Sequence, residues 1–212
     1  IETPYFEKRA MAQLETSETD WLDKIYNNCK EAGIEFNQRL LYSFHTALKT
    51  ADWSPITVLA GVSGTGKSLL PEYYSRFGGI YFMSMAVQPD WDSPQSLFGY
   101  FNSVDNRFNA TTLIRAMVQF SNKANQVNKD SNLSDAMFIV LLDEMNLAPV
   151  EQYFAEYLSV VESRKRNDEG MVVTDPIIHP QYEHKRDEST GELIIKEWYK
   201  NLVKELLAEC PN

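Results

Sequence analysis

The chain carries a complete G-x-x-x-x-G-K-[ST] motif, Gly61-Val62-Ser63-Gly64-Thr65-Gly66-Lys67-Ser68. Its glycines allow the backbone to curl so that successive N–H groups face one anion. The Lys67 ammonium supplies a point charge for β- and γ-phosphates, and the Ser68 hydroxyl is a ligand suited to Mg²⁺. The motif therefore predicts a loop that binds the phosphates of a nucleotide.

The residues on both sides of the motif fit this prediction. A β-branched run at 56–60 predicts a buried strand, and the pattern at 67–77 predicts a helix whose positive end faces the phosphates. Further strands are predicted at 80–85 and 137–142. Because strands alternate with helical segments, the expected fold is α/β with a mainly parallel sheet flanked by helices.

Other segments complete the expected organisation. A capping box that begins at Ser17 opens a helix that ends near Gly33, and a second helix is expected at 37–51. Residues 86–102 are expected to form a long loop with about one helical turn. Later helices are expected at 111–124, from Pro149 to 161, and at 194–209, with a loop at 122–134 and a turn at 188–191.

These segments suggest three parts. Residues 1–52 form a helical N-terminal segment, 53–165 form the phosphate-binding core, and 166–212 form a hairpin-like insertion followed by a C-terminal helix.

A second motif follows the apolar run at 137–142, which ends in Asp143 and Glu144. An apolar strand that ends in two acids is typical of a Walker B segment. Asp143 would hold the metal ion through water, and Glu144 would act as general base toward the water that attacks the γ-phosphate. The alternative is a buried strand that simply exits to solvent. A second acid favours a motor-type ATPase over a small-molecule kinase.

The segments GVSGTGKS, VQPDWDSPQSLFGYFN and LLDEMNLAPVEQYFAEYLSVVE together resemble the McrB-like, dynein-related branch of the AAA+ ATPases, over residues 54–162. The resemblance implies a ring, usually a hexamer, that binds ATP or GTP between subunits. Asn146 matches the family's Asn after the acidic pair, which would orient the water or contact the neighbouring subunit. The alternative is that Asn146 caps the next helix.

The resemblance also implies a segment that lines a central pore. Here it carries Trp91, Phe98, Tyr100 and Phe101, which would grip a translocated strand or a partner; the alternative is that they pack the domain. A full module also needs a sensor strand, an arginine finger and a lid. No convincing sensor strand follows Asp143, and Arg164, Arg166 and Arg115 are finger candidates by default. We therefore expect an incomplete AAA+ module that is nearly inactive as this piece.

The first functional hypothesis is an ATP-hydrolysing motor domain that uses ATP and Mg²⁺, in DNA restriction, phage defence or macromolecular remodelling. Its expected partners are copies of itself, a nuclease and DNA. The second is a nucleotide-gated assembly module with little turnover. A GTP-using subunit is the third, although neither 122–125 nor 128–131 supplies an N-K-x-D guanine-binding motif. Small-molecule kinase is a weak fourth hypothesis.

The composition excludes several classes of protein. The 212 residues carry a net charge of −10 and are 43% hydrophobic, which is ordinary for a globular protein. The acidic balance argues against a protein that coats nucleic acid over its whole surface. The longest apolar run, 137–142, is far shorter than the roughly 20 residues that a membrane helix needs. With two isolated cysteines, Cys29 and Cys210, a cytoplasmic location without a membrane is expected.

Overall fold

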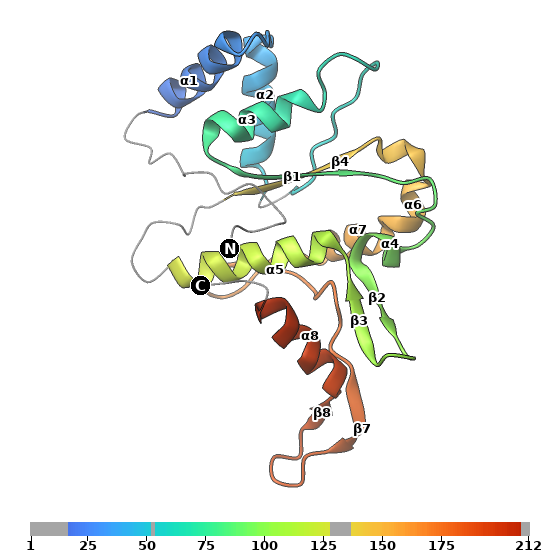
Figure 1. Cartoon of the computed structure of the whole chain (residues 1–212). Coiled ribbons are helices and arrows are strands. Elements are labelled where there is room, and N and C mark those ends of the chain that lie inside the picture. The colour runs from blue at the N-terminus through green and yellow to red at the C-terminus, as the bar shows by residue number, and fades with distance from the viewer. Residues whose placement is uncertain (1–16, 52–53, 128–136, 209–212) are drawn as a thin grey trace.

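The computed structural model describes residues 17–51, 54–127 and 137–208. Strands β1 (Tyr81–Ala86) and β4 (Phe138–Asp143) pair in parallel, with Tyr81 opposite Phe138 and Ala86 opposite Asp143. Helix α3 (Leu69–Gly78) covers one side of this pair and α5 (Thr112–Val127) lies on the other (Figure 1). The predicted α/β class is confirmed, with the parallel sheet reduced to two strands in the described part of the chain.

Helices α1 (Glu18–Glu31) and α2 (Gln38–Lys49) form a pair that packs beside α3 (Figure 1). The predicted capping box is confirmed in part, because the Ser17 hydroxyl accepts a hydrogen bond from the Asp20 amide at 3.2 Å. Asn37 caps α2 in the same way by accepting from the Arg39 amide at 2.9 Å. Both helices therefore begin where a short polar side chain satisfies a free backbone N–H group.

A polar chain inside the helical layer joins α1, α2 and α3. The His45 ring lies 2.8 Å from the Tyr74 hydroxyl through Nδ1 and contacts the Glu18 carboxylate through Nε2. Lys49 also donates a hydrogen bond to Glu18. The hydrogen bonds from Lys49, which has the larger effect, and from His45 lower the pKa of the Glu18 carboxyl. Trp21 packs edge-on against Tyr74. The three helices therefore share one core around the buried Tyr74 ring.

The prediction of a strand at 56–60 is wrong. Residues 54–60 form no strand pairing with any described residue, and Val58 is 70% exposed. Within the described ranges the backbone groups of 55–60 have no backbone hydrogen-bond partner. An apolar, β-branched sequence favours an extended chain, but a strand forms only where a neighbouring strand accepts its hydrogen bonds.

The prediction of a long loop over 86–102 is wrong at its end. The helical turn exists as α4 (Pro94–Phe98), and a hairpin follows, formed by β2 (Gly99–Asn102) and β3 (Arg107–Ala110). The Asn102 side chain accepts from the Val104 amide at 2.9 Å, and Asn106 has a left-handed backbone with φ 50°. These are turn residues with a recognised mechanism, and they close the hairpin.

The single helix expected from Pro149 to 161 is divided. After β4 the chain forms the short 3-10 helix η2 (Met145–Leu147), then α6 (Val150–Tyr153) and α7 (Ala155–Glu162), with the break at Phe154. Two short strands, β5 (Lys165–Arg166) and β6 (Val172–Val173), then pair antiparallel. The break carries no glycine or internal proline that would have revealed it.

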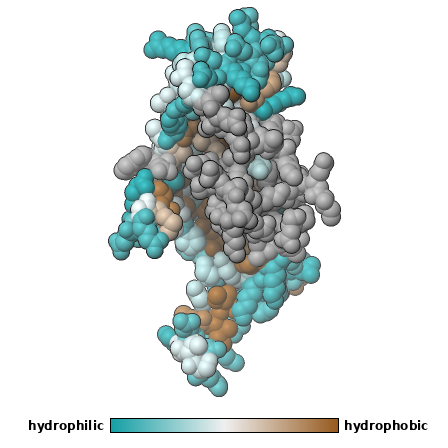
Figure 2. All heavy atoms as spheres, turned by 90° about the vertical axis from the view of Figure 1, so that its left-hand side faces the viewer, coloured by the Kyte–Doolittle hydropathy of each residue, from teal (hydrophilic) through white to brown (hydrophobic). Residues whose placement is uncertain are grey.

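The last part of the chain forms a hairpin and a helix. Strands β7 (Tyr182–Arg186) and β8 (Leu193–Ile195) enclose the predicted turn, and α8 (Glu197–Ala208) begins three residues after the predicted start. The helix packs on β3 and α5, and Trp198 contacts Phe101 with ring centroids 4.5 Å apart. Figure 2 shows hydrophobic side chains exposed near this end, whereas the α1–α2 end is mostly hydrophilic. The loop predicted at 122–134 is wrong for 122–127, which belong to α5. The rest of that prediction, 128–134, and Cys210 lie outside the described residues.

The Gly99→Ala substitution should disrupt the hairpin. Gly99 has φ +96°, and an added Cβ would lie 2.1 Å from the Asn109 carbonyl oxygen. We expect urea denaturation to show a loss of more than about 2 kcal/mol in the free energy of unfolding, because the backbone of β3 would have to move to make room for the Cβ atom. Gly170→Ala is the control: its φ is +79° with no atom within 4 Å, so only strain of about 1 kcal/mol is expected. Equal losses would contradict this explanation.

Candidate nucleotide-binding site

The predicted phosphate loop, residues 61–68, is exposed over its first five residues and leads directly into α3. Gly64 and Gly66 have φ values of +80° and +81°, in the left-handed region that only glycine adopts without cost. The Gly66 carbonyl accepts from the Leu70 amide at 3.0 Å, which starts the first turn of the helix. The two glycines are therefore required by the shape of this loop, as the motif predicted.

Two side chains of the loop bond to the same carbonyl oxygen. Lys67 Nζ donates to the Val62 carbonyl at 2.7 Å, and the Thr65 hydroxyl donates to it at 2.9 Å. The Lys67 ammonium thus lies over the loop itself, where it bridges the two ends of the turn. A phosphate group that entered the loop would offer this ammonium a charged acceptor in place of a neutral one.

The structure brings the two predicted motifs together at Ser68 and Asp143. The Ser68 hydroxyl lies 3.0 Å from both oxygens of the Asp143 carboxylate, and both side chains are half-buried. Ser68 precedes α3 and Asp143 ends β4, so the hydrogen bond joins the start of the helix to the end of the strand. A hydroxyl beside a carboxylate is a set of hard oxygen ligands, and these suit Mg²⁺.

Glu144 has an uncommon backbone conformation. Its φ and ψ are 54° and 42°, and its amide donates to the Asp143 carboxylate at 3.1 Å. The left-handed conformation costs a non-glycine residue about 1–2 kcal/mol. Its side chain is exposed at the end of β4, where the conformation turns the chain sharply into η2.

Asn146 lies within η2 with an exposed side chain. The alternative that Asn146 caps the next helix is wrong, since Pro149 occupies the position before α6. The two other roles expected for Asn146, orienting the water or contacting a neighbouring subunit, stay predictions.

Tyr153 holds the turn after Glu144 in place, and the sequence analysis missed this. The Tyr153 side chain is fully buried, and its hydroxyl donates to the Met145 carbonyl at 3.0 Å. Burial raises the pKa of the Tyr153 hydroxyl, so it remains a hydrogen-bond donor. Trp91 packs edge-on against this ring. The apolar spacing correctly placed Tyr153 in the core, but no local signal showed where its hydroxyl would reach.

The aromatic residues expected in a pore segment mostly pack the domain. Phe98 is 4% exposed, Trp91 contacts Tyr153, and Phe101 contacts Trp198. Tyr100 differs, because 47% of it is exposed on β2. The packing alternative therefore describes three of the four side chains.

The three finger candidates are hydrogen-bonded within the chain. Arg164 donates to the Ala51 carbonyl at 2.6 Å and Arg166 to the Gly170 carbonyl at 2.7 Å. Arg115 donates to the Ala110 carbonyl at 3.3 Å. Arg164 thereby joins the chain after α7 to the end of α2, which is a structural role.

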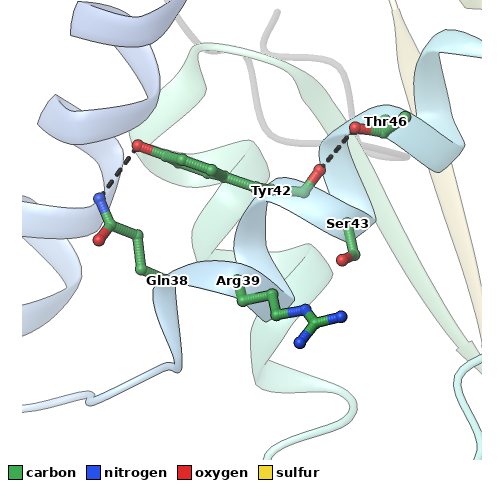
Figure 3. A pocket seen from close by; sticks show the side chains of 5 residues that line it. All are labelled: Gln38, Arg39, Tyr42, Ser43 and Thr46. Atoms are coloured by element: carbon green, nitrogen blue, oxygen red, sulfur yellow. Dashed lines mark hydrogen bonds between the residues drawn. The ribbon is translucent and has the colours of Figure 1, made fainter.

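A separate depression lies along α2, and no predicted site residue lines it (Figure 3). Figure 3 shows Gln38 donating to the Tyr42 hydroxyl and Thr46 donating to the Tyr42 carbonyl, with the Arg39 side chain beside Ser43. In the described ranges, no group of three or more His, Cys, Asp or Glu side chains is arranged to hold a metal ion.

The fold and the site define an α/β protein in which a glycine-rich loop and a strand-end carboxylate meet at one hydrogen bond. No family model, curated protein or solved structure matches the chain. Over the described residues, none of the helices has the length and apolar character to cross a membrane.

The strained backbone at Glu144 leads to a stability prediction. Glu144→Gly should raise the free energy of unfolding by up to about 1 kcal/mol. Glycine adopts the left-handed conformation without strain, and this gain exceeds the additional conformational entropy that glycine loses on folding. Glu144→Gln retains the strain and should show no gain. Chemical denaturation of both variants checks this. A Glu144→Gly variant less stable than Glu144→Gln would mean that the Glu144 side chain stabilises the fold.

Proposed function

We propose that the chain is an ATP-binding and ATP-hydrolysing domain of the AAA+ class, similar to the McrB-like branch. The observation that carries the proposal is the hydrogen bond between Ser68 and Asp143. Two motifs that are far apart in sequence, each predicted for nucleotide chemistry, meet at this bond. A glycine-rich turn without a role in nucleotide binding would not be expected to lie beside a carboxylate at the end of a parallel strand.

In this proposal the loop binds the phosphates through its backbone N–H groups. The positive φ values of Gly64 and Gly66 support a concave backbone, and the N-terminus of α3 adds its partial positive charge. Lys67 would leave the Val62 carbonyl and pair with the β- and γ-phosphates.

The oxygens of Ser68 and Asp143 would hold Mg²⁺ together with phosphate oxygens and water, as this ion commonly binds with few protein ligands. When bound, Mg²⁺ neutralises charge that develops on the phosphate oxygens. Glu144 would accept a proton from the attacking water, whose oxygen forms the new bond to the γ-phosphorus as the bond to ADP breaks. Asn146 would help to orient that water.

Ring assembly, a partner nuclease and DNA as substrate are proposals that depend on the sequence resemblance. The second candidate, a nucleotide-gated module with little turnover, is favoured by one observation: the three candidate finger arginines donate to carbonyls of their own chain. A subunit whose candidate finger arginines stay bonded to their own chain would bind nucleotide but hydrolyse it slowly. GTP is the alternative nucleotide.

Lys67→Ala should abolish nucleotide binding and leave the fold intact. The variant loses a charged donor from the loop, and contacts of this type contribute strongly to phosphate binding. Calorimetric titration with ATP and Mg²⁺ checks it, with Lys165→Ala as an exposed control on β5. Unchanged affinity in Lys67→Ala would exclude the phosphate-binding role of the loop.

Glu144→Gln should bind ATP with normal affinity but hydrolyse it at least about 100-fold more slowly, because glutamine cannot accept the proton. The measurement is phosphate release, in any preparation of the protein that turns over. Glu151→Gln changes an exposed acid in the first turn of α6 and should retain the full rate. If Glu144→Gln kept the parent rate, the general base would be another residue.

A further inference from the structure

Phe36 connects the helical pair to the phosphate loop. It lies in the linker between α1 and α2 and is only 9% exposed. Its side chain belongs to the core that α1, α2 and α3 share, which includes Leu41 and Leu70. The Phe36 ring atom Cε1 lies 3.6 Å from the position that a Cβ atom would take at Gly66. The ring therefore lies on the side of Gly66 to which a Cβ atom would point, at van der Waals distance from that position.

This contact differs from those at the other loop glycines. No heavy atom lies within 4 Å of a Cβ position at Gly64, and the position at Gly61 meets only Thr65 and Lys67, which belong to the loop itself. Among the residues that the structure describes, Phe36 is thus the side chain from outside the loop that lies within 4 Å of a Cβ position at Gly61, Gly64 or Gly66. Gly66 is also the residue whose carbonyl starts α3.

A glycine-rich loop samples many conformations when free, so ordering it on binding costs conformational entropy. A contact that already holds the loop in its binding shape reduces this cost and raises affinity without touching the ligand. We infer that Phe36 is a positioning residue that holds Gly66 in its left-handed conformation and so pre-forms the loop for a nucleotide polyphosphate. This inference rests on the nucleotide binding proposed above.

The position of Phe36 also relates the docking of the α1–α2 pair to phosphate binding by the loop. Phe36 follows α1 by a short linker and immediately precedes Asn37, which caps α2. If docking of this pair favours phosphate binding through Phe36, then phosphate binding must favour docking of the pair by the same factor. On this inference, the docking of the helical pair and the occupancy of the loop would be coupled.

The experiment compares four proteins by calorimetric titration with ATP and Mg²⁺: the unaltered chain, Phe36→Ala, Phe36→Leu and Ile25→Ala. Ile25 is a fully buried residue of the same core, and its Cδ1 atom lies 3.3 Å from the position that a Cβ atom would take at Gly78, at the far end of α3. We expect Phe36→Ala to raise the Kd for ATP about tenfold, a size typical of residues that act through a coupled contact. Phe36→Leu should recover most of the affinity.

Ile25→Ala is the matched control, since it should lower the melting temperature comparably and leave the Kd unchanged. A Phe36→Ala protein with the Kd of Ile25→Ala would overturn the inference while the proposed function stands. Failure of the unaltered chain to bind ATP or GTP would instead overturn the proposed function, and this inference with it. If Phe36→Ala does not fold, Phe36→Val gives the same test, with about a threefold increase expected.

Discussion

The arrangement of this protein depends on the junction where β4 ends and α3 begins. The hydroxyl of Ser68 lies 3.0 Å from both oxygens of the Asp143 carboxylate, where the start of α3 contacts the end of β4. β1 follows α3 and pairs with β4, so the same junction also fixes the register of the sheet. A shift of β4 by one residue would turn Asp143 to the other face of the sheet, away from the helix.

Around this junction, buried aromatic side chains lie next to polar residues that are exposed to solvent. Tyr153, Tyr74 and Phe36 are buried and hold the backbone of the surrounding segments, whereas Glu144 and the first residues of the loop remain open to solvent. Such an arrangement keeps the polar groups available to a charged ligand while their positions are set by packed aromatic rings. The left-handed Glu144 belongs to this scheme, because sharp turns that carry strain are common at functional sites.

The sequence was informative where a local pattern has one physical meaning. The apolar spacing predicted α1, α2, α5 and α8 to within a few residues, and the glycine motif located the turn before α3. It failed where the outcome depends on distant neighbours. Residues 56–60 have strand composition without a pairing partner among the described residues, and the break at Phe154 has no local signal. Phe36 and Gly66 lie near each other but belong to separate segments, so periodicity could not reveal their proximity.

The segment at 55–60 has a consequence for how the protein behaves at high concentration. It is a β-branched run with Val58 largely exposed, and in the described ranges its backbone groups lack backbone partners. A run of this kind is a template for strands of other molecules, and natural proteins usually protect it with lysine, proline or a covering element. Pro55 protects only its first position. Strand pairing between molecules at high protein concentration is therefore expected at this segment, which lies next to the glycine-rich loop.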